Sequence, residues 1–173
     1  MALKPLIVDW SELDFDRPIA DINEIRRINP QRYEMEQLTG ILYENLDEKT
    51  CAGYKDITRE EFWVRGHMPS MPLMPGVVML EAAAQLSSYF TQKYDMLGAA
   101  MLGFGGLENV RFRNIVIPGD RLVLMCRLTK ARRGRMIVAD FQGVVDQAIV
   151  VDGNLKGIPI PDDVLSGQES SQS

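Results

Sequence analysis

The residues best suited to carry chemistry are His67 and Glu81, which lie on either side of a proline-rich stretch. His67 is the only histidine in the chain, and Glu81 is the only charged residue between Pro75 and Gln92. Taken singly, each has a plainer explanation, because a lone histidine is usually a solvated loop residue and a glutamate near a helix start can turn to solvent. Together, an imidazole and a carboxyl group at an apolar site are the two proton carriers that proton transfer at carbon requires.

The elements around these two residues are expected to hold them in place. Pro69, Pro72 and Pro75 forbid regular helix, because proline lacks an N–H and biases the preceding residue to extended geometry. His67 is therefore expected on a stiff loop. After Pro75 and Gly76, the run to Tyr94 contains no helix breaker and is apolar on almost every face, a pattern typical of a buried helix.

On these residues the chain resembles a known enzyme family. Residues 66–85, GHMPSMPLMPGVVMLEAAAQ, resemble the pattern G-H-F-P-G-x-P-x-M-P-G-V-x-x-x-E-A-x-A-Q of the beta-hydroxyacyl-acyl-carrier-protein dehydratases of fatty-acid synthesis. Residues 28–33, INPQRY, resemble that family's L-P-H-R-Y, and residues 111–122, RFRNIVIPGDRL, resemble R-F-R-R-P-V-V-P-G-D-Q-L. The resemblance spans roughly residues 25–160. Departures from the family pattern include Gln31, Glu60, Met68 and Ser70.

The resemblance implies the hot-dog fold, an α+β architecture in which an antiparallel sheet wraps around a long buried central helix. It also implies dehydration of a (3R)-hydroxyacyl thioester on acyl carrier protein to the trans-2-enoyl thioester, without a cofactor. The family builds each site across a dimer interface, with the histidine from one subunit and the glutamate from the other. We therefore expect a homodimer, or a trimer of such dimers.

The residues also indicate a division of roles for this reaction. We expect His67 to abstract the carbon-bound proton and Glu81, kept protonated by its apolar helix, to protonate the departing hydroxyl group. A single histidine could also serve both steps. Gly76, at a helix N-terminus with unpaired N–H groups, is the expected donor to the thioester oxygen. Gln85 lies one helical turn beyond Glu81 and is expected to orient its carboxyl group.

The acyl chain is predicted to lie along the buried helix, in a channel lined by methionines and by a glycine-rich strand. Methionine adapts its shape to irregular spaces, and six of the ten methionines fall between positions 68 and 101. Plain core packing is the alternative explanation. The expected channel residues are Met68, Met74, Met79 and Phe104.

Composition limits the other classes of function. With 173 residues and 46% hydrophobic content, the chain is expected to form one domain over residues 1–173, with an N-terminal extension over 1–24 and a disordered tail over 166–173. Two cysteines are too few for a disulfide framework and one histidine leaves no ordinary zinc cluster, so we expect free thiols and no metal. No uncharged apolar run is long enough to span a membrane, and the acidic N-terminus is unlike a signal peptide, which predicts a cytoplasmic protein.

Positive charge is concentrated in one segment of an acidic chain. The net charge is −5, yet residues 110–135 contain eight cations and one acid, a net charge of +7. Alternating solvated strand residues would explain this equally well. Nucleic acid is a poor partner, because the overall charge is negative and no aromatic-interleaved basic motif appears. We predict instead that an acyl carrier protein, bearing the phosphopantetheine-linked acyl substrate, docks on Arg111, Arg113, Arg132 and Arg133.

The remaining segments are predicted from their patterns. Asp21 or Asn23 is expected to cap a short helix that Pro30 ends. Alternating apolar residues predict a hairpin over residues 40–57 and strands over 101–113, 121–129 and 136–145. A last hairpin is expected to turn at residues 152–154, Asp-Gly-Asn, and to end near Pro159.

Two rival functions remain open. A hot-dog thioesterase would activate water at the thioester carbon with a carboxylate, and release of free thiol would reveal it. A non-catalytic acyl-chain or carrier-binding protein is suggested only by the departures at Met68 and Ser70. The presence of both His67 and Glu81 favours dehydration over either rival.

Overall fold

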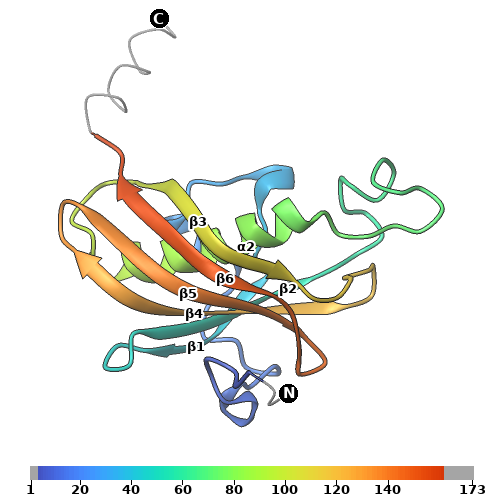
Figure 1. The fold of residues 1–173 in the computed structure, drawn as a ribbon, viewed down its shortest axis with the longest axis horizontal. Helices are drawn as coiled ribbons and strands as arrows, with labels where there is room; N and C mark the ends of the chain where they lie inside the picture. The colour runs from blue at the N-terminus through green and yellow to red at the C-terminus, as the bar shows by residue number, and fades with distance from the viewer. Residues whose placement is uncertain (1–3, 162–173) are drawn as a thin grey trace, which may run out of the picture.

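A six-stranded antiparallel sheet curves around one long helix in the computed structural model, which describes residues 4–161 (Figure 1). The strands follow one another across the sheet in the order β1-β2-β4-β5-β6-β3, so β3 is an edge strand. Their bounds are β1 (Gly40–Asn45), β2 (Thr50–Asp56), β3 (Leu102–Phe112), β4 (Arg121–Arg132), β5 (Met136–Val145) and β6 (Ala148–Pro159). The helices are α1 (Ile22–Ile28) and α2 (Gly76–Lys93), with 3₁₀ turns at Trp10–Glu12 and Tyr33–Met35. The expected α+β architecture is confirmed.

The central helix α2 is buried along most of its length, but not at its start. Its later turns place Leu86, Tyr89 and Phe90 in the main core against the inner face of the sheet, and none of the three is exposed. Burying each such side chain contributes about 1.5–3 kcal/mol. Val77, in the first turn, is 72% exposed. The expectation that α2 is buried on every face is therefore wrong for its first turn.

The short helix and the first hairpin form as their sequences predict. Asp21, rather than Asn23, caps α1, because its side chain accepts a hydrogen bond from the Glu24 N–H at 3.0 Å. The hairpin of β1 and β2 turns at residues 46–49, between Asn45 and Thr50. The two strands pair in antiparallel register, as the alternating apolar pattern indicated.

The predicted hairpin turn at residues 152–154 is wrong, because these residues lie in the middle of the continuous strand β6. The chain turns earlier, at Asp146 and Gln147, which both adopt positive φ (48° and 64°). Tight two-residue hairpin turns need positive φ and usually contain glycine. This turn contains none, so it left no clear mark in the sequence.

Asp152 and Gly153, which resemble turn residues, are instead explained by their contacts inside β6. A Cβ at Gly153 would lie 3.0 Å from the side chains of Phe141 and Val110, closer than side chains usually pack, which favours glycine there. Asp152 is buried and accepts hydrogen bonds from Arg113 and from Lys4. Burial acts to raise the pKa of Asp152, but these two cations outweigh it and hold the pKa below its usual value.

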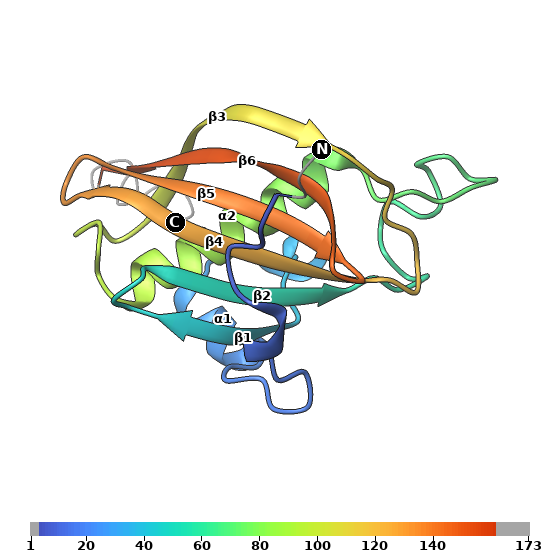
Figure 2. The same ribbon diagram turned by 60° about the horizontal axis from the view of Figure 1, so that its bottom comes forward.

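The N-terminal segment, residues 4–20, crosses the face of the sheet opposite α2 (Figure 2). Its Val8 and Leu13 join a second, smaller core on that face. The buried side chain of Gln142 ties the segment down, since it accepts from the Ile7 N–H at 2.8 Å and donates to the Pro5 carbonyl at 2.9 Å. The N-terminal segment therefore docks on the body of the protein.

Three further predictions concern membrane spans, metal ligands and the C-terminal tail. None of the helices there is long and apolar enough to cross a membrane. Residues 4–161 also contain no group of three or more His, Cys, Asp or Glu residues that could hold a metal ion. The tail predicted to be disordered, residues 166–173, lies outside the described residues.

The two cysteines, far apart in sequence, face each other across neighbouring strands. Cys51 on β2 pairs in register with Cys126 on β4, and both are fully buried free thiols. Burial, and next the neighbouring Cys126, raises the pKa of the Cys51 thiol well above its usual value. Since the thiolate is the reactive form, the raised pKa leaves Cys51 unreactive, and burial shields both thiols from reagents in the folded protein.

We expect neither thiol to react with iodoacetamide in the folded protein at pH 8, and both to react once the protein is unfolded in denaturant. Mass spectrometry of the alkylated protein at successive times measures this directly. Rapid alkylation without denaturant would show that the β2–β4 pair opens locally and is not part of a stable core.

Candidate active site

His67 lies in the segment between β2 and α2, where two hydrogen bonds fix its backbone and its ring. Its N–H donates to the Trp63 carbonyl at 2.7 Å, and its Nδ1 lies 2.8 Å from the Leu73 carbonyl oxygen. A carbonyl oxygen only accepts, so Nδ1 carries the proton and Nε2 of the neutral ring is left as an acceptor. His67 is therefore held in the tautomer that a general base acting through Nε2 requires.

The proline-rich segment that carries His67 is anchored at both ends. Trp63 is buried on one side, and on the other the N–H of buried Met74 donates to the Val116 carbonyl at 2.8 Å. Between these anchors the chain forms turns and no helix or strand. Met68 adopts a φ of +59°, a left-handed conformation that is uncommon for residues other than glycine. A strained residue thus directly follows the histidine.

Glu81 lies in the second turn of α2 and is partly buried. Its Oε1 accepts a hydrogen bond of 2.7 Å from Nε2 of Gln85, which lies one turn further along the helix. Gln85 is 2% exposed. The contact expected between these two side chains is present.

Gly76 begins α2 directly after Pro75. Within residues 4–161, no hydrogen bond uses the N–H of Gly76 or of Val77. These donors lie at the positive end of the helix dipole, an arrangement that suits a developing negative charge. A Cβ at Gly76 would lie 2.6 Å from the ring of Phe112, so glycine also lets the end of β3 approach the start of the helix.

His67 and Glu81 lie on different segments of the chain. No hydrogen bond within residues 4–161 joins them: Nδ1 of His67 contacts the Leu73 carbonyl oxygen, and Oε1 of Glu81 accepts from Gln85. Residues 57–75 project beyond the end of the sheet in both views (Figures 1 and 2). The geometry therefore presents an acid and a base on separate supports.

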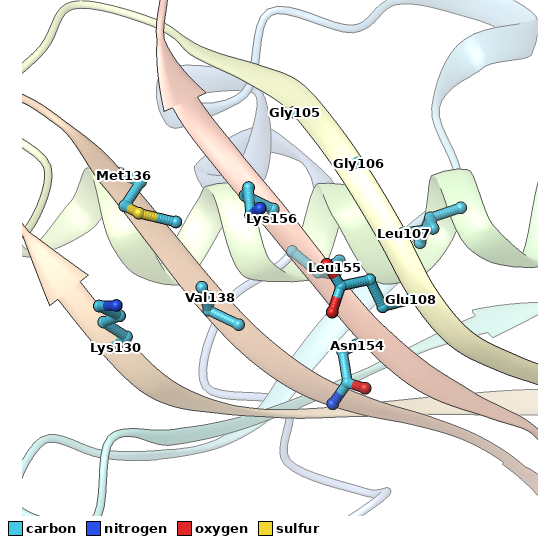
Figure 3. Close-up of a pocket in the computed structure, with 10 residues that line it drawn as sticks. All are labelled: Gly105, Gly106, Leu107, Glu108, Lys130, Met136, Val138, Asn154, Leu155 and Lys156. Atoms are coloured by element: carbon cyan, nitrogen blue, oxygen red, sulfur yellow. The ribbon is translucent and has the colours of Figure 1, made fainter.

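A groove of about 330 Å³ lies elsewhere, on the face of the sheet away from α2 (Figure 3). Lys130, Val138 and Lys156 contribute to it from β4, β5 and β6, and the glycines of β3 border it. Neither His67 nor Glu81 is among its lining residues. This groove is not where the two proton carriers could act.

The four predicted channel residues have two different environments. Met74 and Met79 are buried in the main core, where plain packing accounts for them. Met68 and Phe104 are about half exposed, on the projecting segment and on the edge strand. The acyl-chain channel stays a prediction, and Met68 and Phe104 are the two predicted channel residues that are exposed.

The four predicted docking arginines fall into two groups at opposite ends of β3. Arg111 and Arg113 lie where β3 ends, beside the start of α2, and Arg113 pairs with Asp152. Arg132 and Arg133 lie at the turn between β4 and β5. Arg133 pairs with Asp95 and packs on Gly98, in the loop that leads into β3. Since β3 has eleven residues, about 33 Å separates its two ends.

Several groups that position the site were not found from the sequence. Most are backbone atoms: the carbonyls of Leu73 and Met35 and the N–H of Gln37. Backbone groups carry no mark in a sequence. The side chain of Asn29, which donates to the Gln85 carbonyl at 2.9 Å, precedes a proline and resembles an ordinary loop residue.

Comparison with known proteins places the chain in a family. The model of the FabA-like domain matches residues 29–154, so the chain belongs to the FabA-like family. The 3-hydroxyacyl-[acyl-carrier-protein] dehydratase FabZ of Clostridium botulinum (strain Okra / Type B1) is 36% identical over 135 residues, which cover 78% of this chain and 88% of that protein. The protein of the same name from Polynucleobacter asymbioticus is 34% identical over 139 residues, covering 80% and 92%.

Solved structures share the fold at low sequence identity. The dehydratase heterocomplex ApeI:P from Xenorhabdus doucetiae aligns with a TM-score of 0.67 at 15% identity, over 83% of this chain and 95% of that one. The uncharacterized protein PH1136 from Pyrococcus horikoshii aligns with a TM-score of 0.59 at 16% identity, over the same shares. The expected hot-dog fold is confirmed.

Proposed function

We propose that this protein dehydrates a (3R)-hydroxyacyl thioester, carried by acyl carrier protein, to the trans-2-enoyl thioester in fatty-acid synthesis. The observation that carries the proposal is the set of hydrogen bonds that orient His67 and Glu81. His67 offers a free Nε2 lone pair, while Gln85 orients the Glu81 carboxyl group. The FabZ relatives, which are 3-hydroxyacyl-[acyl-carrier-protein] dehydratases by name, agree with this chemistry.

The proposed reaction assigns one atom to each step. Nε2 of His67 takes a proton from C2, and the electrons of that C–H bond form the C2=C3 double bond. The C3–O bond breaks as Glu81 gives its proton to the leaving hydroxyl group, which departs as water. The free N–H of Gly76 donates to the thioester oxygen, where negative charge develops.

The direct test is to mix purified protein with a 3-hydroxyacyl carrier thioester and to follow the conjugated enoyl product by absorbance and mass spectrometry. We expect the product to form with the thioester intact, and Glu81→Gln to lower kcat by about 10²–10⁴-fold. Release of free thiol would indicate the rival thioesterase. Binding without turnover would indicate the non-catalytic rival.

We further propose that the active unit is a homodimer built on the edge strand β3. Among residues 4–161 this strand pairs only with β6, and it exposes about half of the Phe104 and Phe112 side chains. An unpaired edge that carries large apolar side chains favours pairing with another copy. Antiparallel pairing of two β3 strands would bring the start of one beside the end of the other.

A homodimer of this kind could complete the site that one chain leaves open. The projecting segment of one subunit would place His67 next to the α2 start of its partner, where Glu81 and the free N–H groups lie. The trimer of dimers and the cytoplasmic location stay predictions.

Complementation tests the shared site. We expect the His67→Asn and Glu81→Gln homodimers to be nearly inactive. The heterodimer of the two variants should recover about half of the activity of the unsubstituted protein, since one of its two sites combines an unaltered His67 with an unaltered Glu81. Co-expression with two different affinity tags isolates the heterodimer. A heterodimer as inactive as its parents would place both residues of each site in one chain.

The same dimer would bring the two arginine groups together. In one chain they lie at opposite ends of the sheet, but antiparallel pairing of two β3 strands would bring the partner's turn between β4 and β5 to the same end of the joined sheet as Arg111. We propose that a carrier protein docks across this junction. Within residues 4–161, neither Arg111 nor Arg132 takes part in an ion pair, so both are free to meet an acidic partner.

Charge reversal tests the docking surface. We expect Arg111→Glu and Arg132→Glu to lower kcat/KM for a carrier-linked substrate, more strongly at low salt because exposed charges are screened beyond about 8 Å at physiological salt. Turnover of a coenzyme-A-linked substrate should be unchanged. Arg17→Glu, on the exposed N-terminal segment, is the matched control. Equal losses with both substrates would contradict docking at these arginines.

A further inference from the structure

The side-chain amide of Gln85 can adopt only one orientation. Its Nε2 donates to the Met35 carbonyl at 2.6 Å, and its Oε1 accepts from the Gln37 N–H at 2.9 Å. A carbonyl oxygen cannot donate and a backbone N–H cannot accept. Exchanging the oxygen and nitrogen of the amide would therefore break both hydrogen bonds inside a buried environment, at a considerable cost.

This orientation determines how Gln85 meets the acid. The second hydrogen on Nε2 points to Oε1 of Glu81 at 2.7 Å. Because an amide nitrogen only donates, Oε1 must accept with a lone pair and cannot also direct a proton toward Gln85. The carbonyl oxygen of a protonated carboxyl group is a better acceptor than its hydroxyl oxygen, so this hydrogen bond favours a proton of Glu81 on the other oxygen, Oε2.

The backbone segment that orients Gln85 is itself tied to α2. The Nδ2 of Asn29 donates to the backbone carbonyl of Gln85, and Asn29 is buried. Arg26 closes the other side by binding Glu36 through two hydrogen bonds. Residues 29–37 thus form a support held at both ends beside the second and third turns of α2.

We propose that residues 29–37 position the catalytic acid. Through the Met35 carbonyl and the Gln37 N–H they lock the amide of Gln85, which reserves Oε1 of Glu81 as an acceptor and leaves the transferable proton on Oε2. This inference rests on the proposed dehydratase function. Gln85 is then a positioning residue, which acts on the substrate only through Glu81.

The chain contains a matched control for the structural part of this arrangement. Gln142 is also buried, and its side chain likewise accepts from one backbone N–H and donates to one backbone carbonyl. It lies on the opposite face of the sheet and contacts no carboxyl group through these bonds. Replacing either glutamine by methionine keeps a similar volume and removes the same two backbone hydrogen bonds.

The experiment compares Gln85→Met with Gln142→Met, using the full chain and the carrier-linked substrate. We expect both to lower the melting temperature, but only Gln85→Met to lower kcat, by about 10–100-fold with KM little changed, since a hydrogen bond to an ionisable group is worth about that factor. An equal loss of kcat in both variants would overturn the proposal. So would full kcat in Gln85→Met.

A second variant tests whether hydrogen-bond donation by the side chain at position 85 matters, rather than its shape. In Gln85→Glu, one oxygen can still accept from the Gln37 N–H, but the other can donate to Met35 or Glu81 only when it is protonated. We expect its kcat, divided by that of the unchanged protein at the same pH, to rise as the pH falls from about 8 to about 5. A ratio that does not change with pH would show that shape alone matters.

The outcomes separate this inference from the proposed function. An unchanged protein that forms no enoyl product refutes the function itself. An unchanged protein that is active, together with a Gln85→Met variant that is equally active, refutes only the positioning role of residues 29–37.

Discussion

Burial of α2 against the curved sheet is the constraint on which the rest of the structure depends. Leu86, Tyr89 and Phe90 are fully enclosed, and the apolar surface that they remove from water fixes the axis and rotation of the helix. Once that rotation is set, Glu81 and Gln85 must lie on the side that meets residues 29–37. The helix start must also lie at the end of the sheet, where Gly76 packs under Phe112.

A buried helix imposes its own requirement, because a polar side chain in it needs partners. Gln85 meets this requirement fully, and its hydrogen bonds connect the core to the acid. Glu81 sits one turn closer to the exposed end of α2, where a substrate could reach it. The buried end of α2 therefore packs in the core, and its start carries the acid Glu81. The base, His67, lies on a separate segment that is anchored by Trp63 and Met74.

Much of this could be predicted from the sequence, because periodicity and proline placement report on local backbone. The extent of α2, the stiff segment around His67 and the pairing of Glu81 with Gln85 all follow from spacing along one element. The turn at Asp146 and Gln147 could not be predicted, since it lacks glycine, and the Asp-Gly-Asn of β6 has a tertiary cause in Phe141 and Val110. Met35 and Gln37 act through backbone atoms, which leave no mark in the sequence. The separation of the four arginines into two groups depends on the order of strands in the sheet, which the sequence does not show.

The central claim is that His67 and Glu81 move protons at C2 and at the C3 oxygen of a thioester that stays intact. Because dehydration is reversible, the most direct measurement is mass spectrometry of a trans-2-enoyl carrier thioester incubated with the protein in D₂O. The account predicts a 3-hydroxyacyl thioester that carries one deuterium at C2. Release of the free acid and thiol, or recovery of only unlabelled enoyl thioester, would contradict it.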